Sequence, residues 1–147
     1  MQLFYTQQLS ETQATLEGDE FQHCIKTLRK KVGDTIFLMD GLGFYYEAEL
    51  IELTKRNALL KVLEKEERPL AWDFDLHIAI APTKNMDRLE WFVEKAVEIG
   101  INQISPILCR YSERKKLRLD RLQKIALSAA KQSYKFKIPR IHELRDF

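Results

Sequence analysis

The sequence has few cysteines and few glycines, which excludes several kinds of site. Its two cysteines, Cys24 and Cys109, lie in no CxxC motif and near no pair of histidines. The sequence therefore predicts reduced thiols, no disulfide framework and no metal site. Among the five glycines, Gly41 and Gly43 lack the third glycine of a dinucleotide-binding loop. They fall between two expected strands, which favours a hairpin turn.

Long apolar runs are also missing. No stretch approaches the roughly 20 apolar residues that cross a membrane. The first residues, MQLFYTQQLS, lack the basic start and apolar core of a secretory signal peptide. The sequence therefore predicts a globular cytoplasmic protein with no membrane partner.

Acidic residues are scarce in one segment. Residues 110–140 contain eleven basic and two acidic side chains, a local charge of +9, whereas the whole chain carries only +2, so the remainder carries −7. An acidic body with one strongly basic segment is typical of a protein that binds a polyanion such as nucleic acid. A basic helix that is merely exposed to solvent would give the same count.

The first half of the chain has the pattern of a small β-rich domain. Residues 32–64 contain three apolar segments separated by turn residues, which predicts an antiparallel meander. The expected strands are Thr35–Met39, Phe44–Leu53 and Ala58–Leu63, with Leu3–Tyr5 as an edge strand.

A helix is expected before the meander, with Asp19 as its N-cap. Its buried face should carry four residues at helical spacing: Phe21, Cys24, Ile25 and Leu28. His23 is expected to point away from that face, next to the basic run Arg29–Lys31. A histidine there either contacts a phosphate or does nothing specific.

The second half alternates strands and helices, which is typical of an α/β domain with a parallel sheet. The charged segment Glu64–Asp73 is expected to be the linker. The elements expected after it are a strand at Leu76–Ala81, a helix over residues 86–99, a strand at Gln103–Leu108, a helix capped by Asp120, and a strand beginning at Pro139. Three strands are few for such a sheet, so we expect it to be incomplete.

The helix over residues 86–99 has two distinct faces. Apolar residues recur at three- and four-residue steps from Leu89 to Ile99, and Gly100 supplies the expected C-terminal cap. A second row falls in a narrow sector if the helix extends back far enough: Lys84, Arg88, Trp91, Lys95 and Glu98. This row is either a functional edge or a solvated face with ordinary charge pairs.

Several motifs occur together in an order known from one family. The first half contains His23, Leu28-Arg29, Gly33-Asp34 and Asp40-Gly41; the second contains K-x-x-D-R-x-E from Lys84, K-x-x-E-x-G from Lys95, then Pro106, Arg110, Ser112, Gln132-Ser133 and Pro139. In this order and spacing the motifs resemble those of the RsmE-type ribosomal RNA uridine methyltransferases. The resemblance covers nearly the whole chain.

That resemblance implies a fold of class α+β followed by α/β. Residues 1–68 would form an RNA-binding, PUA-like β-barrel, and residues 69–147 the first part of a SPOUT domain, a parallel sheet with helices and a knotted C-terminal end. It implies a cytoplasmic homodimer that transfers a methyl group from S-adenosylmethionine to N3 of a uridine in 16S ribosomal RNA of the small subunit. The Gly-Pro-Glu-Gly-Gly segment of the family's cofactor loop is absent from the sequence. We therefore expect the cofactor-binding residues beyond Phe147, and this chain to be an N-terminal portion that is inactive alone.

The resemblance also suggests site residues. Arg88, Lys95 and Arg110 would be cations near the reacting uridine, and Glu98 would orient one of them or act as a base. The residues expected to bind RNA are His23, Arg29, Lys30, Lys31, Lys84, Ser112, Arg114, Lys115, Lys116, Arg118, Gln132 and Ser133.

Two other functions stay open on the sequence alone. One is a non-catalytic RNA-binding module, in which the α/β half serves for docking. The other is an α/β enzyme for a small molecule with an accessory barrel, which the absence of a phosphate loop, a nucleophile motif or a metal cluster disfavours.

Overall fold

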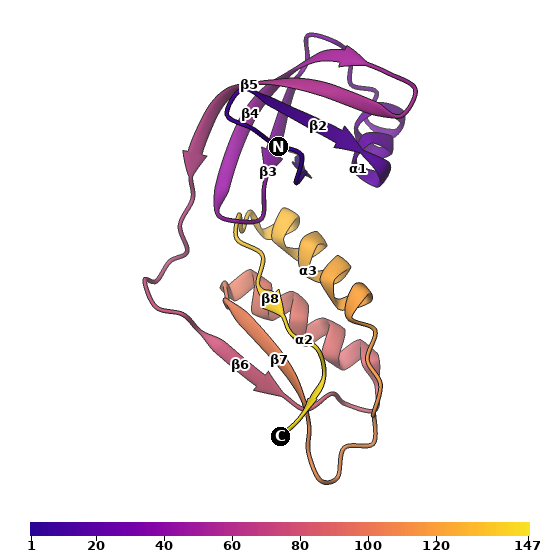
Figure 1. Ribbon diagram of the computed structural model, residues 1–147, viewed down its shortest axis with the longest axis vertical. Helices are drawn as coiled ribbons and strands as arrows, with labels where there is room; N and C mark the ends of the chain where they lie inside the picture. Colours follow the sequence, from indigo (N-terminus) through magenta and orange to yellow (C-terminus); the bar gives the residue numbers. More distant parts are fainter. The chain divides into compact units, whose positions relative to one another are not determined.

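A computed structural model describes residues 1–147, and the chain divides into two compact units. We call Met1–Pro69 the curled-sheet unit and Leu70–Phe147 the parallel-sheet unit. The elements of both are labelled in Figure 1. None of the helices is both long enough and apolar enough to cross a membrane.

The curled-sheet unit contains five strands and one short helical region. In chain order these are β1 (Leu3–Tyr5), β2 (Gln13–Glu17), α1 (Gly18–Gln22), the π-helical turn η1 (His23–Thr27), β3 (Thr35–Met39), β4 (Phe44–Leu53) and β5 (Asn57–Glu67). The strand order is β1-β3-β4-β5-β2, with β1 parallel to β3 and the other pairs antiparallel. The N–H of Thr15 also donates to the carbonyl of Gln8 at 2.9 Å. The segment after β1 thereby reaches β2, and the sheet curls round one core.

That core is built from alternate residues of the strands and from one face of α1. Strand side chains alternate between the two faces of a sheet, so every second residue of a curled sheet points inward. The buried cluster consists of Phe4, Ala14, Leu16, Phe21, Cys24, Ile36, Leu38, Tyr46, Ala48, Leu50, Ala58 and Leu60. Burial raises the pKa of the Cys24 thiol to about 11, so this cysteine behaves as a small apolar side chain. Cys109, by contrast, is exposed.

The expected helix near Asp19 differs from the observed one at both ends. Asp19 lies in the first turn of α1, and the N-cap is Glu17, which ends a strand absent from the expectation. The chain then widens into the π-helical turn η1, closed by a hydrogen bond from the Leu28 N–H to the His23 carbonyl. Leu28 is its C-cap and is exposed instead of buried. The expectation of an outward His23 is also wrong, because its half-buried ring lies 5.8 Å from that of Phe4.

Strand β4 has the predicted bounds, but β5 runs four residues into the expected linker. Phe44 to Glu47 pair with Glu67 to Glu64, so the charged segment completes a hairpin with the start of β4. The ammonium of Lys65 lies 4.2 Å from the centre of the Phe44 ring, a cation–π contact that favours this pairing. The first four residues of the expected linker are therefore an exposed strand end, whereas the boundary between the two units, after Pro69, falls within the rest of that segment.

The parallel-sheet unit has the predicted alternation. Its elements are β6 (His77–Ile80), α2 (Met86–Ile99), β7 (Gln103–Leu108), α3 (Leu119–Ser133), β8 (Arg140–Ile141) and β9 (Arg145–Asp146). The order is β6-β7-β8 with all pairs parallel, and β9 pairs with the end of β7. Successive right-handed crossovers that step in one direction put both helices on the same face, and α2 and α3 pack together (Figure 1).

The helix ends follow from local chemistry. The Asn85 side chain accepts a hydrogen bond from the Asp87 N–H at 2.9 Å, and Gly100 adopts a left-handed conformation with φ of 99°, as a C-terminal glycine cap requires. Because α2 begins at Met86, Lys84 lies in the preceding loop and is not part of a helical row. The N-cap of α3 is Arg118 and not Asp120, which lies in the first turn.

The face of the parallel sheet away from the helices is polar. The His77 Nε2 lies 2.7 Å from the Ser105 hydroxyl, and the His142 Nε2 lies 2.9 Å from the Gln103 side-chain oxygen. The Gln103 side-chain amide donates to Asp75 at 2.5 Å. This chain of contacts ties β6 and the end of β8 to the central strand β7.

Candidate nucleic-acid interface

The loops that follow β6 and β7 meet at the carboxyl edge of the parallel sheet. Ligands of open α/β sheets bind at this edge, because the connecting loops converge there. An open groove of about 460 Å³ lies between the two loops, lined by Lys84, Glu113, Arg114, Lys115 and Lys116. A second hollow of about 600 Å³ shares Lys84 and Glu113 with it and extends over residues 81–84 and 109–113. We call these two connected spaces the basic groove.

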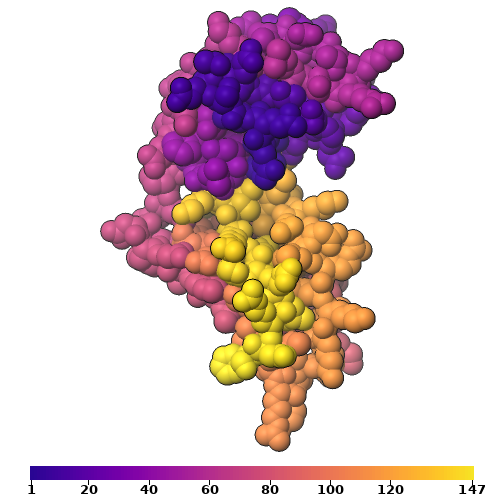
Figure 2. Space-filling view, viewed as in Figure 1, coloured from indigo at the N-terminus to yellow at the C-terminus, as the bar shows by residue number.

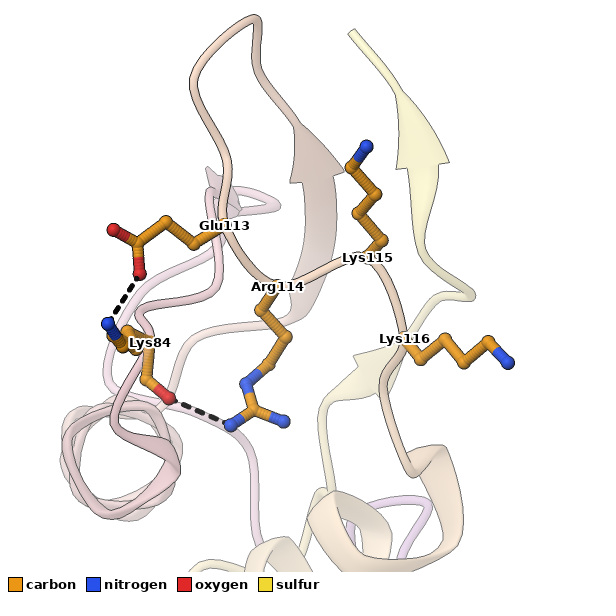
Figure 3. A pocket seen from close by; sticks show the side chains of 5 residues that line it. All are labelled: Lys84, Glu113, Arg114, Lys115 and Lys116. Atoms are coloured by element: carbon orange, nitrogen blue, oxygen red, sulfur yellow. Dashed lines mark hydrogen bonds and ion pairs between the residues drawn. The ribbon is translucent and has the colours of Figure 1, made fainter.

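The basic groove is shaped by contacts between its two loops (Figure 3). The Arg114 guanidinium donates from Nη2 to the Lys84 carbonyl at 2.8 Å, and the Lys84 ammonium lies 3.3 Å from the Glu113 carboxylate. Lys115 and Lys116 point away from this pair, along the far side of the loop. Four cations and one carboxylate give the lining of the first space a net charge of +3. That excess favours a bound anion.

The Arg114 guanidinium has an N–H group that can still donate to a bound anion. Its Nε is buried and has no hydrogen-bond partner, an arrangement that costs free energy until an acceptor is supplied. Its Nη2 is fixed by the Lys84 carbonyl, so the planar guanidinium is already oriented. A guanidinium held in this way suits the geometry of a phosphate.

The β7–α3 segment projects from the end of the parallel-sheet unit in Figures 1 and 2. Its turn is closed by Ser112, whose hydroxyl accepts from the Cys109 N–H and whose N–H donates to the Cys109 carbonyl, both at 2.9 Å. The Arg110 guanidinium lies 5.5 Å from the centre of the exposed Tyr111 ring. The predicted residues Lys84, Arg110, Ser112, Arg114, Lys115 and Lys116 therefore gather in one place.

A different hollow lies on the first turns of α2. It measures about 410 Å³, is mostly apolar, and is lined by Asp87, Arg88, Trp91 and Phe92. The Trp91 side chain is 62% exposed. Arg88 therefore belongs to this hollow and not to the lining of the basic groove.

Lys95 and Glu98 lie further along α2. Lys95 is seven residues, or about 10 Å of helix, from Arg88. Its ammonium lies 2.9 Å from Glu94 and 2.9 Å from Glu98, and these hydrogen bonds raise the pKa of Lys95. This is the ordinary i,i+3 charge pair that the sequence left open as an alternative. The structure thus separates the expected catalytic residues into three places: Arg110, Arg88, and the Lys95–Glu98 pair.

Two expected RNA-binding residues lie at the far end of α3. Gln132 and Ser133 end this 15-residue helix, roughly 20 Å along its axis from Arg118. The Ser133 hydroxyl donates to the Ala129 carbonyl at 2.7 Å. Arg118 pairs with Asp120 at 2.9 Å, and this contact is the main cause of the lowered pKa of Asp120.

The curled-sheet unit carries a second set of expected RNA-binding residues. Arg29 and Lys31 are exposed, and Arg29 has a φ of 55°, a rare conformation for a residue other than glycine. Lys30 donates to the Thr35 carbonyl at 3.3 Å, and the Lys31 N–H donates to Asp34 at 2.8 Å. These contacts fix the turn that presents the basic run.

One structural pair near the groove was not expected. The Arg121 Nε lies 2.5 Å from one Glu90 carboxylate oxygen, and Nη2 donates to the other at 3.1 Å. The first contact is an ion pair without hydrogen-bond alignment. The Glu90 side chain is only 17% exposed, and the pair joins α2 to the first turn of α3. Glu90 lies in the motif that starts at Lys84, but only packing reveals its partner.

Two family models match the chain. An RNA methyltransferase domain matches residues 71–147, and an RNA methyltransferase PUA domain matches residues 16–63. Among curated relatives, the ribosomal RNA small subunit methyltransferases E of Bacillus subtilis strain 168 and Rickettsia conorii are 28% and 29% identical, covering 96% and 87% of this chain. The chain spans only 57% and 52% of their lengths.

Solved structures resemble the chain over nearly all of its length. A probable rRNA-methyltransferase from Porphyromonas gingivalis has a TM-score of 0.91 at 35% identity, covering 99% of this chain and 61% of its own. A ribosomal RNA small subunit methyltransferase E from Neisseria gonorrhoeae, bound to S-adenosyl methionine, has a TM-score of 0.83 at 26% identity. It covers 99% of this chain and 62% of its own length.

Proposed function

Because the chain belongs to the RNA methyltransferase family, whose domain model matches residues 71–147, we propose that this protein methylates N3 of a uridine in 16S ribosomal RNA. The predicted fold is confirmed: a PUA-like curled sheet precedes a SPOUT-type parallel sheet with helices. The chain spans about three-fifths of the length of the structures it resembles. Methyl transfer is therefore proposed for the whole protein.

The basic groove is the observation that carries the RNA part of the proposal. Its first space is lined by Lys84, Arg114, Lys115 and Lys116, and its second space by Arg110. Cations that neutralise phosphates release counterions, so the affinity falls steeply as salt rises. The exposed basic run Arg29–Lys31 of the curled-sheet unit would add phosphate contacts of the same kind.

S-adenosylmethionine is the proposed cofactor, and it supplies the methyl group when bound. The basic groove does not fit it, because the cofactor is itself cationic at sulfur and would be repelled by the lining, whose first space alone carries a net charge of +3. We therefore assign none of the residues of this chain to the cofactor. We assign the basic groove to the anionic partner, the RNA.

The residues of this chain would hold and orient the uridine. A uridine N3 must lose its proton before it can accept a methyl group, and a fixed cation nearby favours the resulting anion. We propose Arg110 for this role, because it lines the second space of the basic groove. Neither Arg88 nor the Lys95–Glu98 pair lines the basic groove, so we propose that they act on the uridine only through other residues.

The test is methyl transfer by the full-length protein to unmethylated small ribosomal subunits with labelled S-adenosylmethionine. We expect one methyl group on N3 of a uridine in 16S RNA, located by nuclease mapping and mass spectrometry. Arg110→Gln should lower the transfer rate by a factor of about 100–1,000, as loss of one preorganised donor does. Lys124→Gln, an exposed cation on α3 outside the groove, is the matched control and should leave the rate unchanged. Transfer to another atom, or none, would overturn the proposal.

A non-catalytic RNA-binding module is the alternative. Both proposals predict salt-dependent RNA binding, but only the first predicts methyl transfer. We also propose a cytoplasmic homodimer acting on the small subunit, which sedimentation of the full-length protein at several concentrations would test.

A further inference from the structure

The two tryptophans of the parallel-sheet unit have opposite surroundings. Trp72 stacks on Phe74, with ring centroids 5.7 Å apart, and its Nε1 is buried. Trp91 is 62% exposed and forms a wall of the hollow on α2. An exposed indole next to an apolar hollow of about 410 Å³ costs free energy in water. Such a surface is typical of a binding site.

The walls of the hollow suit a flat ring with polar edges. Phe92 and Trp91 supply the apolar part, and Asp87 and Arg88 supply an acceptor and donors at the rim. The carboxylate of Asp87 and the guanidinium of Arg88 have no ion pair or side-chain hydrogen bond. Both are therefore available to a ligand. A nucleobase has an aromatic face for stacking and edge groups for such hydrogen bonds.

The residues that line the hollow are close in the sequence to those that line the basic groove. Only Asn85 and Met86 separate Lys84, which lines the groove, from Asp87, which lines the hollow. Arg114 donates to the carbonyl of Lys84 and so fixes the start of α2 against the β7–α3 segment. A chain of phosphates in the groove would thus bring its bases close to Trp91.

We propose that Trp91 stacks an unpaired base of single-stranded RNA whose phosphates lie in the basic groove. This inference rests on the proposed function in so far as RNA is the partner. It adds a base-binding site to a surface for which only phosphate contacts were expected. The site accepts any base, because stacking uses the ring face that all bases share.

The test is binding of a fluorescein-labelled uridine decamer by the 147-residue chain, measured by anisotropy at several KCl concentrations. Trp91→Ala should weaken binding by about 5- to 150-fold, the effect of losing one base stack. Trp91→Phe should retain most of the affinity. The slope of log affinity against log salt should stay unchanged in both variants, because the phosphate contacts remain. Arg114→Gln, in contrast, should reduce that slope by about one phosphate contact.

Ile99→Ala is the matched control. Ile99 is 56% exposed on the same helix but does not line the hollow, so its loss should leave RNA affinity unchanged. Trp91→Ala should also fold normally, because the side chain is exposed; urea unfolding followed by circular dichroism checks this.

The possible failures of the two proposals differ. If the wild-type chain binds the decamer with a salt-dependent affinity and Trp91→Ala binds equally well, the stacking inference is wrong and RNA binding stands. If the wild-type chain does not bind the decamer at all, both the stacking inference and the proposal of RNA binding in the basic groove are wrong. If Trp91→Ala converts a dimer to a monomer in sedimentation without changing RNA affinity, the hollow is a protein interface and the inference is overturned.

Discussion

The curled-sheet unit and the parallel-sheet unit bury their sheets in different ways. In the first, four strands contribute fully buried leucines to a single cluster, among them Leu16, Leu38, Leu50 and Leu60. In the second, α2 and α3 cover only one face of a four-stranded sheet, and the other face carries the His77–Ser105 and His142–Gln103 contacts. Apolar burial thus dominates in the first unit, whereas polar contacts have a larger share in the second.

The difference has a consequence for function. Apolar burial depends little on pH or salt, whereas hydrogen bonds and ion pairs between partly exposed groups depend on both. The basic groove, the hollow on α2 and the Glu90–Arg121 pair all belong to the parallel-sheet unit. The unit that carries these candidate sites is therefore the one whose stability we expect to respond to solution conditions.

The largest expected effect tests whether the units unfold separately. Leu60→Ala removes a fully buried side chain from the curled-sheet core and should lower the unfolding free energy of that unit by about 2–5 kcal/mol. Both tryptophans, Trp72 and Trp91, belong to the other unit. Urea unfolding followed by tryptophan fluorescence should therefore keep its midpoint, while circular dichroism shows an earlier transition.

Leu122→Ala is the matched change in the parallel-sheet unit, where Leu122 is also fully buried. It should shift the tryptophan-detected midpoint and leave the other transition in place. Equal shifts of both signals by either variant would mean that the units unfold together, and the comparison between them would fail.

The next effect concerns the polar contacts between helices. Arg121→Ala leaves the Glu90 carboxylate unpaired at 17% exposure and should lower the unfolding free energy of the parallel-sheet unit by about 1–3 kcal/mol. Arg118→Ala breaks the pair with Asp120, whose side chain is 61% exposed, and should lower the unfolding free energy by clearly less, because water screens an exposed pair. Tryptophan-detected urea unfolding measures both. Equal costs would show that burial of the Glu90 pair adds nothing.

A smaller effect concerns pH. Burial lowers the pKa of His142, and Arg140, His77 and Arg145 act in the same direction. A histidine whose pKa is lowered by folding binds its proton more readily in the unfolded chain, where its pKa is about 6.5. The contribution of His142 to the free energy of unfolding is therefore complete above about pH 6.5. It is lost as the pH falls from there toward the pKa of His142 in the folded state.

His142→Gln should flatten this dependence. The test compares tryptophan-detected urea midpoints of the wild type and the variant between pH 7.5 and 5. The difference between the two should shrink or change sign as the pH falls. A constant difference across that range would exclude His142 as the source.

The sequence predicted those elements whose ends depend on local chemistry. Asp40 and Gly41 set the turn before β4, and Gly100 ends α2, so both elements have the predicted starts or ends. Elements that depend on a partner strand were missed or shortened. Strand β2 is defined by its pairing with β5, and the charged end of β5 is defined by its pairing with Phe44 to Glu47.

The candidate site was predictable to a similar extent. The loops after adjacent parallel strands must meet, which brings Lys84 to Arg114 as the strand pattern implied. The row on α2 was misleading because residues in one sector of a helix can still lie far apart along its axis, as Arg88 and Lys95 do. The Glu90–Arg121 contact and the exposure of Trp91 depend on how helices pack, which a single sequence does not specify.

The smallest expected effect separates stability from binding within the basic groove. The Lys84–Glu113 pair joins side chains that are 85% and 63% exposed, so Glu113→Gln should change the unfolding free energy by less than about 0.5 kcal/mol. The same change raises the net charge of the lining of the groove's first space from +3 to +4. RNA affinity at low salt should therefore rise by about two- to fivefold, with the gain shrinking as salt screens the added charge.

Anisotropy with the uridine decamer at 20 and 200 mM KCl measures this gain in affinity. The control is Glu98→Gln, which neutralises a carboxylate outside the groove. An equal gain in both variants would mean that only the net charge of the chain matters, and that the groove does not concentrate RNA.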